Sequence, residues 1–142
     1  MAVHSNQESF VKQAAKGEFN VNLAPQALSE ADADASLGRL SLDKHFHGEL
    51  EATSKGEMLS ARSSVQGSAG YVAIERVTGT LHGRSGSFVL QHSGTMDRGT
   101  PSLSVRVVPD SGTDQLIGLS GSMQIDILDG KHYYTFEYVL PE

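Results

Sequence analysis

The sequence contains no cysteine and no tryptophan, and each absence removes a class of function. Without cysteine there is no disulfide framework, no thiolate metal site and no cysteine nucleophile. Aromatic residues make up only 6% of the chain, so a platform on which single-stranded nucleic acid could stack is poorly supported.

The chain also lacks a cluster of basic residues and a long apolar run. Its formal net charge is -6, and its 11 lysines and arginines are scattered, which argues against neutralisation of a phosphate backbone. No apolar run approaches the roughly 18 residues of a membrane-spanning helix, and the N-terminus has no secretory signal. We therefore expect a cytoplasmic protein with no nucleic-acid partner and no membrane partner.

What the sequence does contain is alternation of apolar and polar residues. Short alternating runs extend from Gly17 to Leu140, and glycine-rich turns interrupt them about every ten residues. This pattern, without a convincing long helix, predicts one all-β domain, a single antiparallel β-barrel of about eight strands. We assign residues 17–142 to this barrel and residues 1–16 to an N-terminal extension.

Several strands and turns can be placed individually. The clearest hairpin joins residues 71–81 to residues 84–94, and Asp129-Gly130 predicts a type I′ turn between the last two strands. Residues 40–52 are predicted as one long strand whose even positions face inward. Residues 54–56 are predicted as the turn that follows it.

Two charged residues interrupt faces that are otherwise apolar, Lys44 and Glu75. A charge inside a small barrel is costly unless it is paired or used, so we expect the two to face each other or a ligand. A structural salt bridge and a catalytic role both fit this pattern. A desolvated Glu75 would have a raised pKa and could act as a general base.

Other polar side chains lie in apolar rows and are candidates for contacting a ligand. His92 shares its strand face with Phe88 and Leu90, and Tyr134 begins an alternating aromatic row. Such rows fit both a plain core and the wall of a pocket. The predicted ligand-binding residues are Lys44, Tyr71, Glu75, His92 and Tyr134.

The segment His45-Phe46-His47, with Glu51 four positions after the second histidine, has metal-ligand residue types. These side chains share the polar face of the predicted strand 40–52. The second glycine-and-histidine motif of a cupin is missing, and we see no third ligand converging from another strand. The sequence therefore predicts exposed histidines, no specific metal and no cofactor.

Five blocks of the sequence carry a family resemblance, namely residues 42–53, 70–75, 86–92, 118–121 and 134–138. In this order they resemble a bacterial family known as domain of unknown function 3224 (DUF3224). The resemblance implies a small β-barrel similar to that of allene oxide cyclase, with an internal cavity. It implies no established activity. Plant allene oxide cyclases share none of these blocks, so their catalytic residues cannot be placed here.

Three functions are compatible with these observations. The first is binding of a small apolar molecule in an internal cavity of the barrel. The second is a cofactor-independent isomerase or cyclase that acts in the same cavity. The third is an oligomeric structural barrel without a ligand. The size of the cavity would separate the third function from the other two.

Overall fold

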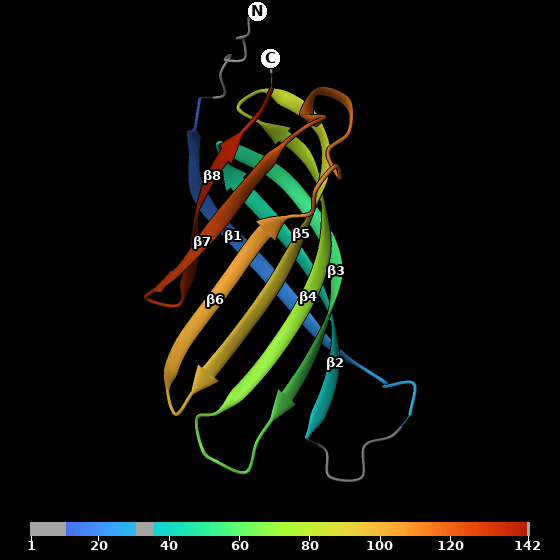
Figure 1. Ribbon diagram of the computed structural model, residues 1–142, viewed down its shortest axis with the longest axis vertical. Helices are drawn as coiled ribbons and strands as arrows, with labels where there is room; N and C mark the ends of the chain where they lie inside the picture. The colour runs from blue at the N-terminus through green and yellow to red at the C-terminus, as the bar shows by residue number, and fades with distance from the viewer. Residues whose placement is uncertain (1–10, 31–35, 142) are drawn as a thin grey trace, which may run out of the picture.

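In the computed structural model, which describes residues 11–30 and 36–141, the chain folds into a closed β-barrel (Figure 1). Each strand pairs antiparallel with the next along the chain, and β1 also pairs with β8. The strands are β1 (Gln13–Gln26), β2 (Leu37–Gly48), β3 (Leu50–Arg62), β4 (Ala69–Leu81), β5 (Arg84–Asp97), β6 (Thr100–Val107), β7 (Ser120–Leu128) and β8 (Lys131–Val139). The predicted all-β antiparallel barrel of eight strands is confirmed.

The prediction of one strand over residues 40–52 is wrong. β2 ends at Gly48 and β3 begins at Leu50, so the two halves of this segment form a tight hairpin. Gly48 has a φ of 114°, and a Cβ there would lie 2.8 Å from the carbonyl oxygen of Lys16. Only glycine tolerates both conditions. Residues 54–56, predicted as a turn, consequently lie within β3.

Other boundaries differ less. β1 starts at Gln13, within the predicted extension, and continues to Gln26. The hairpin of β4 and β5 is confirmed, although both strands are longer than expected. Asp129 and Gly130 have φ values of 52° and 78°, the two positive angles that a type I′ turn requires.

One end of the barrel, which we call the closed end, is filled by apolar side chains. It carries the β2–β3 and β4–β5 turns and lies at the top of Figure 1. The rings of Phe88 and Phe136 stack with their centroids 5.6 Å apart. Leu116 and Leu119, from the β6–β7 connection, complete this core.

That connection holds the closed end together because it replaces a strand along the first half of β5. Thr113 exchanges hydrogen bonds with Ser87, and the side chain of Gln115 accepts one from the Ser85 amide. The connection includes the 3-10 helix η2 (Asp114–Leu116). Within residues 11–30 and 36–141, no helix has the length and apolar character needed to cross a membrane.

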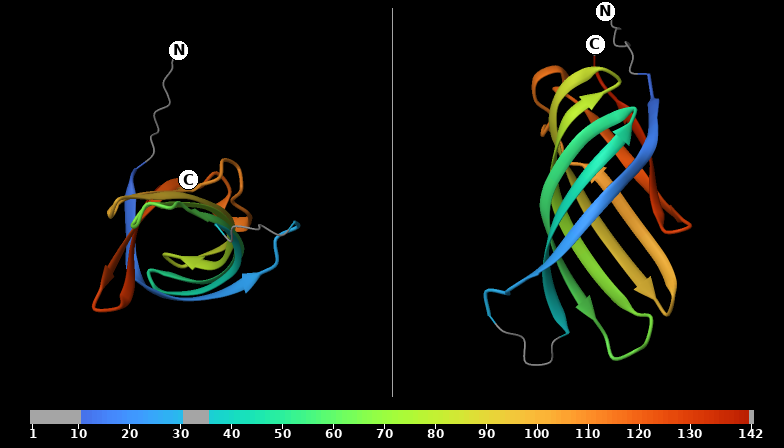
Figure 2. Two further views of the ribbon diagram at one scale, coloured as in Figure 1. Left: turned by 90° about the horizontal axis from the view of Figure 1, so that it is seen from below. Right: turned by 180° about the vertical axis from the view of Figure 1, so that it is seen from behind.

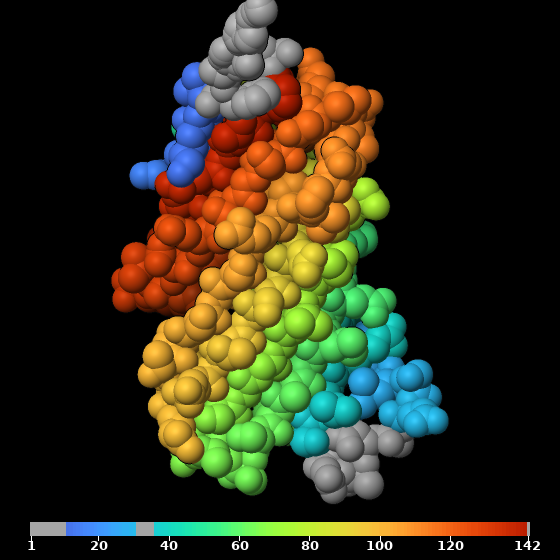
Figure 3. Space-filling model, in the orientation of Figure 1, coloured from blue at the N-terminus to red at the C-terminus, as the bar shows by residue number. Residues whose placement is uncertain are grey.

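The opposite end, which we call the open end, carries the β3–β4 and β5–β6 turns and is the end seen from below in Figure 2. Its inward-facing apolar side chains are partly exposed, with Leu23 50%, Leu103 44% and Met96 41% accessible. In the described part of the chain, β6 and β7 share one register pair, Arg106 with Ser122. The β7–β8 hairpin projects to the left above β6 (Figure 3).

Candidate functional site

Three polar side chains surround the carboxylate of Glu75, which lies inside the barrel and is 0% exposed. One carboxylate oxygen, Oε2, accepts from Lys44 Nζ at 2.8 Å and from His92 Nε2 at 2.5 Å. The other, Oε1, accepts from Ser54 Oγ at 2.6 Å. We call Lys44, Ser54, Glu75 and His92 the interior cluster.

The interior cluster follows from strand alternation and strand tilt. Lys44 lies directly opposite Ser54 in the pairing of β2 with β3. On each of the next two strands, the residue of the cluster is displaced by two positions from the direct partner, which gives Glu75 on β4 and His92 on β5. Tilted strands in a closed barrel place such displaced residues at one height. The pairing of Lys44 with Glu75 therefore agrees with the expectation from the sequence.

Lys44 is further surrounded by aromatic rings. Its Nζ lies 4.8 Å from the ring centroid of Phe19 and 5.6 Å from that of Phe46. Cations are attracted to the face of aromatic rings, so these contacts replace part of the water that a buried ammonium loses. They also fix the ammonium on one side of the carboxylate.

The expectation of a raised pKa for Glu75 is wrong. Burial raises the pKa of this carboxyl, but the hydrogen bond from His92 and the charge of Lys44 oppose it, with a further hydrogen bond from Ser54. The result is a pKa of about 2, against an ordinary value of 4.5. Glu75 is therefore ionised and fully hydrogen-bonded, which removes the basis for assigning it the role of general base.

Tyr71 joins this cluster from the side of the open end. Its hydroxyl lies 3.3 Å from His92 Nδ1, and His92 Nε2 contacts Glu75 on the other side of the ring. Burial, and then the charge of Glu75, raise the pKa of Tyr71, so its hydroxyl keeps its proton at neutral pH. Gly94 makes room for the ring, because a Cβ there would lie 2.5 Å from Tyr71 Cε1.

The fifth predicted site residue, Tyr134, lies apart from this group. Its hydroxyl donates to the carbonyl oxygens of His47, at 2.9 Å, and Leu50, at 3.0 Å, and accepts from the Leu50 amide. These contacts satisfy backbone groups where the chain turns from β2 into β3. Tyr134 thus stabilises the hairpin, and within the described residues its hydrogen bonds are with backbone groups of His47 and Leu50 and not with the interior cluster.

Sequence reasoning missed Ser54, which supplies a hydrogen bond to the buried carboxylate. The signal was present, because Ser54 continues the inward even positions from Leu50 and Ala52. The misplaced turn at residues 54–56 concealed it.

The two histidines of β2 point outward, as predicted, with side chains 52% (His45) and 42% (His47) exposed. The stated reason for expecting no metal is wrong, however. Glu51 lies on β3, a separate strand, and its Oε2 is 3.5 Å from His45 Nε2 and 3.3 Å from His47 Nδ1. A third metal-ligating side chain therefore does converge on the pair from another strand.

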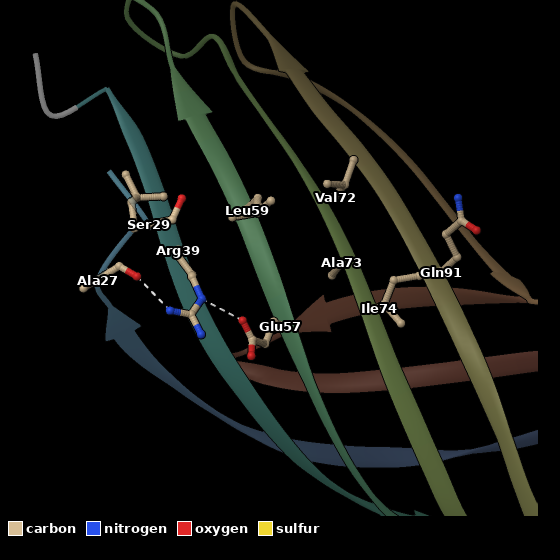
Figure 4. A pocket seen from close by; sticks show the side chains of 10 residues that line it. Ala27, Ser29, Arg39, Glu57, Leu59, Val72, Ala73, Ile74 and Gln91 are labelled. Carbon is tan, nitrogen blue, oxygen red and sulfur yellow. Dashed lines mark hydrogen bonds and ion pairs between the residues drawn. The ribbon is translucent and has the colours of Figure 1, made fainter. Parts of the chain in front are cut away.

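The outer wall also carries a hollow of about 1040 Å³ across β2 to β5. Figure 4 shows Leu59, Val72 and Ile74 from neighbouring strands beside the Arg39–Glu57 ion pair. None of the five predicted ligand-binding residues lines this hollow. It is separated from the interior cluster by the barrel wall, because strand alternation turns Val72 and Ile74 outward and Glu75 inward.

Comparison with known proteins agrees with this architecture. The sequence pattern of the family described as "Protein of unknown function (DUF3224)" matches residues 15–138. A crystal structure of a protein of unknown function from the same family, from Shewanella oneidensis MR-1, is 49% identical with a TM-score of 0.85. The match covers 94% of this chain and 99% of that one. Among curated proteins, none matches the chain.

Neither match concerns an allene oxide cyclase, so the likeness to that barrel stays a prediction. The family assignment has firmer support, because the matched region covers all eight strands and the solved relative shares the fold over almost its whole length. The chain belongs to the DUF3224 family.

Proposed function

We propose that this protein binds a small, largely apolar molecule at the open end of the barrel, above a floor formed by the interior cluster and Tyr71. The observation that carries the proposal is the juxtaposition of two surfaces. Inward-facing leucine and methionine side chains are 41–50% exposed at this end, and a hydrogen-bonded set of charged groups lies deeper on the same inner face.

Without a ligand, both the exposed apolar side chains and the buried charged groups lower the stability of the folded protein. Apolar area left in water forfeits roughly 25 cal/mol per Å², and buried charges lose hydration that their pairing only partly replaces. Ligand sites combine the same two elements, an apolar lining and a few fixed polar groups. At the closed end, by contrast, the inward-facing Phe88 and Phe136 are no more than 1% exposed.

The hydrogen bonds within the cluster define the chemistry of the ligand. Both oxygens of Glu75 are occupied, and the charge of Lys44 is balanced by that carboxylate. Tyr71 is more exposed than either and lies toward the open end, with a hydroxyl that can turn to a ligand. We therefore expect an uncharged molecule that is mostly apolar and has one carbonyl or hydroxyl oxygen.

Titration with the neutral apolar dye N-phenyl-1-naphthylamine tests the proposal, because its fluorescence rises in apolar surroundings. Leu103→Asp places a charge on the inner face at the open end and is expected to weaken dye binding about ten-fold or more. Val72→Asp is the matched control, since Val72 is 52% exposed but faces outward. Dye binding that is lost in Val72→Asp and kept in Leu103→Asp would assign the dye to the outer hollow. That result, or no binding by the unchanged protein, counts against the proposal.

A second candidate function is proton transfer to the bound molecule, which the chain of contacts from Tyr71 through His92 to Glu75 favours. A hydroxyl held by an imidazole, itself oriented by a carboxylate, can donate its proton to a ketone oxygen while water removes a proton from the adjacent carbon, which gives the enol. In the reverse step the hydroxyl recovers its proton from the enol oxygen, and the carbon takes a deuteron from the solvent. An apolar ketone incubated with the protein in deuterium oxide would then gain deuterium beside its carbonyl. Tyr71→Phe is expected to abolish this exchange, and exchange that persists in this variant would exclude the role.

We also propose the cytoplasmic location that the sequence predicts, whereas a homo-oligomer is an alternative that the sequence leaves open. A barrel that binds a small ligand requires neither a membrane nor a nucleic acid as partner. Sedimentation of the full chain with and without the dye would give the oligomeric state directly.

A further inference from the structure

We propose that His45, His47 and Glu51 form a binding site for a divalent transition metal ion on the outer face of the β2–β3 hairpin. This site is independent of the ligand site at the open end, because the barrel wall separates outward-facing from inward-facing side chains. The ion that fits two imidazoles and one carboxylate is of the zinc, nickel or copper class, not magnesium or calcium.

The spacing of the three ligand atoms supports this assignment. Tetrahedral zinc with bonds of about 2.0–2.1 Å separates its ligand atoms by about 3.3 Å. Glu51 Oε2 already lies 3.3 Å from His47 Nδ1 and 3.5 Å from His45 Nε2. All three ligand atoms lie within 4.8 Å of one another.

The hairpin positions these side chains before any ion arrives. Residues two apart on a strand have Cα atoms about 6.7 Å apart, but the rings of His45 and His47 have centroids only 4.1 Å apart. The two rings therefore lean toward each other above the strand. Glu51 is held separately, because its Oε1 accepts the Gly48 amide at 3.3 Å and leaves Oε2 to face the imidazoles.

The site also has room for ligands that the chain does not supply. Each of the three side chains is 42–53% exposed, so water can reach an ion from the solvent side. Three protein ligands with an open fourth position is the arrangement of an exchangeable site, in contrast to the four-ligand sites that close around a structural ion.

Calorimetric titration with zinc chloride, on the full chain freed of any histidine tag, tests the proposal. The unchanged protein is expected to bind one zinc ion, and Glu51→Gln or His47→Gln is expected to weaken binding at least about ten-fold. Glu57→Gln is the matched control. Glu57 also lies on the outer face of β3 in an ion pair, but its partner is Arg39 and not histidine. This control is expected to bind zinc unchanged.

Electron paramagnetic resonance of bound copper(II) identifies the ligand atoms directly. The unchanged protein is expected to show hyperfine coupling to two imidazole nitrogens, reduced to one in His45→Gln. The proposal is overturned if the unchanged protein gives no binding heat, or if Glu51→Gln binds zinc as tightly as Glu57→Gln. A copper spectrum without coupling to two nitrogens also overturns it.

Discussion

Glu75 and Glu51 are two carboxylates with similar partners and opposite surroundings. Glu75 contacts Lys44 and His92 inside the barrel, and its side chain is 0% exposed. Glu51 contacts His45 and His47 on the outer face, and its side chain is 53% exposed. The same kind of histidine–carboxylate contact is therefore present in two media that weaken charge interactions to very different degrees.

The difference shows that burial decides whether water can replace a partner that a charged group has lost. Inside the barrel, removing one partner leaves a charge with no water to solvate it, so the group must be maintained as a whole. On the outer face, water replaces a lost partner at little cost. The exposed triad can consequently rearrange around the metal ion proposed above, whereas the interior cluster has to be kept as a whole.

The largest expected effect comes from removing the buried charge. Glu75→Gln leaves Lys44 buried without a counter-ion, and it should lower the free energy of unfolding by about 3–5 kcal/mol. Urea denaturation of this variant beside the unchanged protein measures the difference. A loss below about 1 kcal/mol would mean that water reaches Lys44 and that the interior cluster is not sealed.

A double replacement sharpens this result. Lys44→Met combined with Glu75→Leu removes both charges and should recover most of the lost stability, because an apolar pair replaces a costly ionic one. Dye binding at the open end then reports whether the cluster also serves the ligand. Recovered stability with lost binding is the expected outcome.

The sequence predicted this interior pair because alternation is a strong signal along a regular strand. Lys44 and Glu75 each interrupt an apolar row, and the structure places both inward. The same alternation misled at residues 40–52, because the hairpin at Gly48 keeps even positions inward on both of its strands. A continuous strand and a tight hairpin therefore gave the same pattern, and Glu51 was placed on the wrong strand.

Contacts between distant strands could not be predicted from this pattern. The partners of Glu75 on β3 and β5, Ser54 and His92, depend on strand register and tilt, which no local signal encodes. Tyr134 illustrates the limit, since its aromatic row predicts the inward face but not that its hydroxyl binds the backbone at His47 and Leu50.

The next largest effect is expected when Glu75 is protonated at low pH, which lowers the free energy of unfolding. The pKa of Glu75 is about 2 in the folded protein, below its ordinary value of 4.5. A lowered pKa stabilises the fold above pH 4.5, and this contribution is lost as the pH falls toward 2. The difference between these two pKa values is equivalent to about 3 kcal/mol in the free energy of unfolding.

Urea denaturation at a series of pH values across this range measures the loss. Glu75→Gln has no carboxyl to protonate at this position. Its free energy of unfolding should therefore fall less steeply below pH 4.5 than that of the unchanged protein. An equal loss of unfolding free energy in the two proteins as the pH falls from 4.5 toward 2 would contradict the lowered pKa of Glu75.

A smaller effect is expected at the edge of the interior cluster. Tyr71→Phe removes one hydroxyl at 3.3 Å from His92 and should lower stability by only about 0.5–1.5 kcal/mol. Thermal denaturation checks this. Gly94→Ala makes the complementary test, because its added Cβ would displace the ring of Tyr71 rather than remove the hydroxyl. A Tyr71→Phe loss as large as that of Glu75→Gln would place the hydroxyl inside the sealed cluster.

The smallest effect is expected on the outer face, where Glu51→Gln should leave the unfolding midpoint unchanged. The Gly48 amide, then the charges of His47 and His45, lower the pKa of Glu51, but solvent screens these contacts and can replace each of them. Thermal denaturation without metal measures this, and Glu57→Gln on the same strand face serves as the control. The comparison becomes sharper when zinc is added. The unchanged protein and Glu57→Gln should then unfold at a higher temperature, because an ion bound only by the folded chain stabilises it, and Glu51→Gln should not. A marked destabilisation by Glu51→Gln in the absence of metal would show that the outer triad, like the interior cluster, is a structural contact.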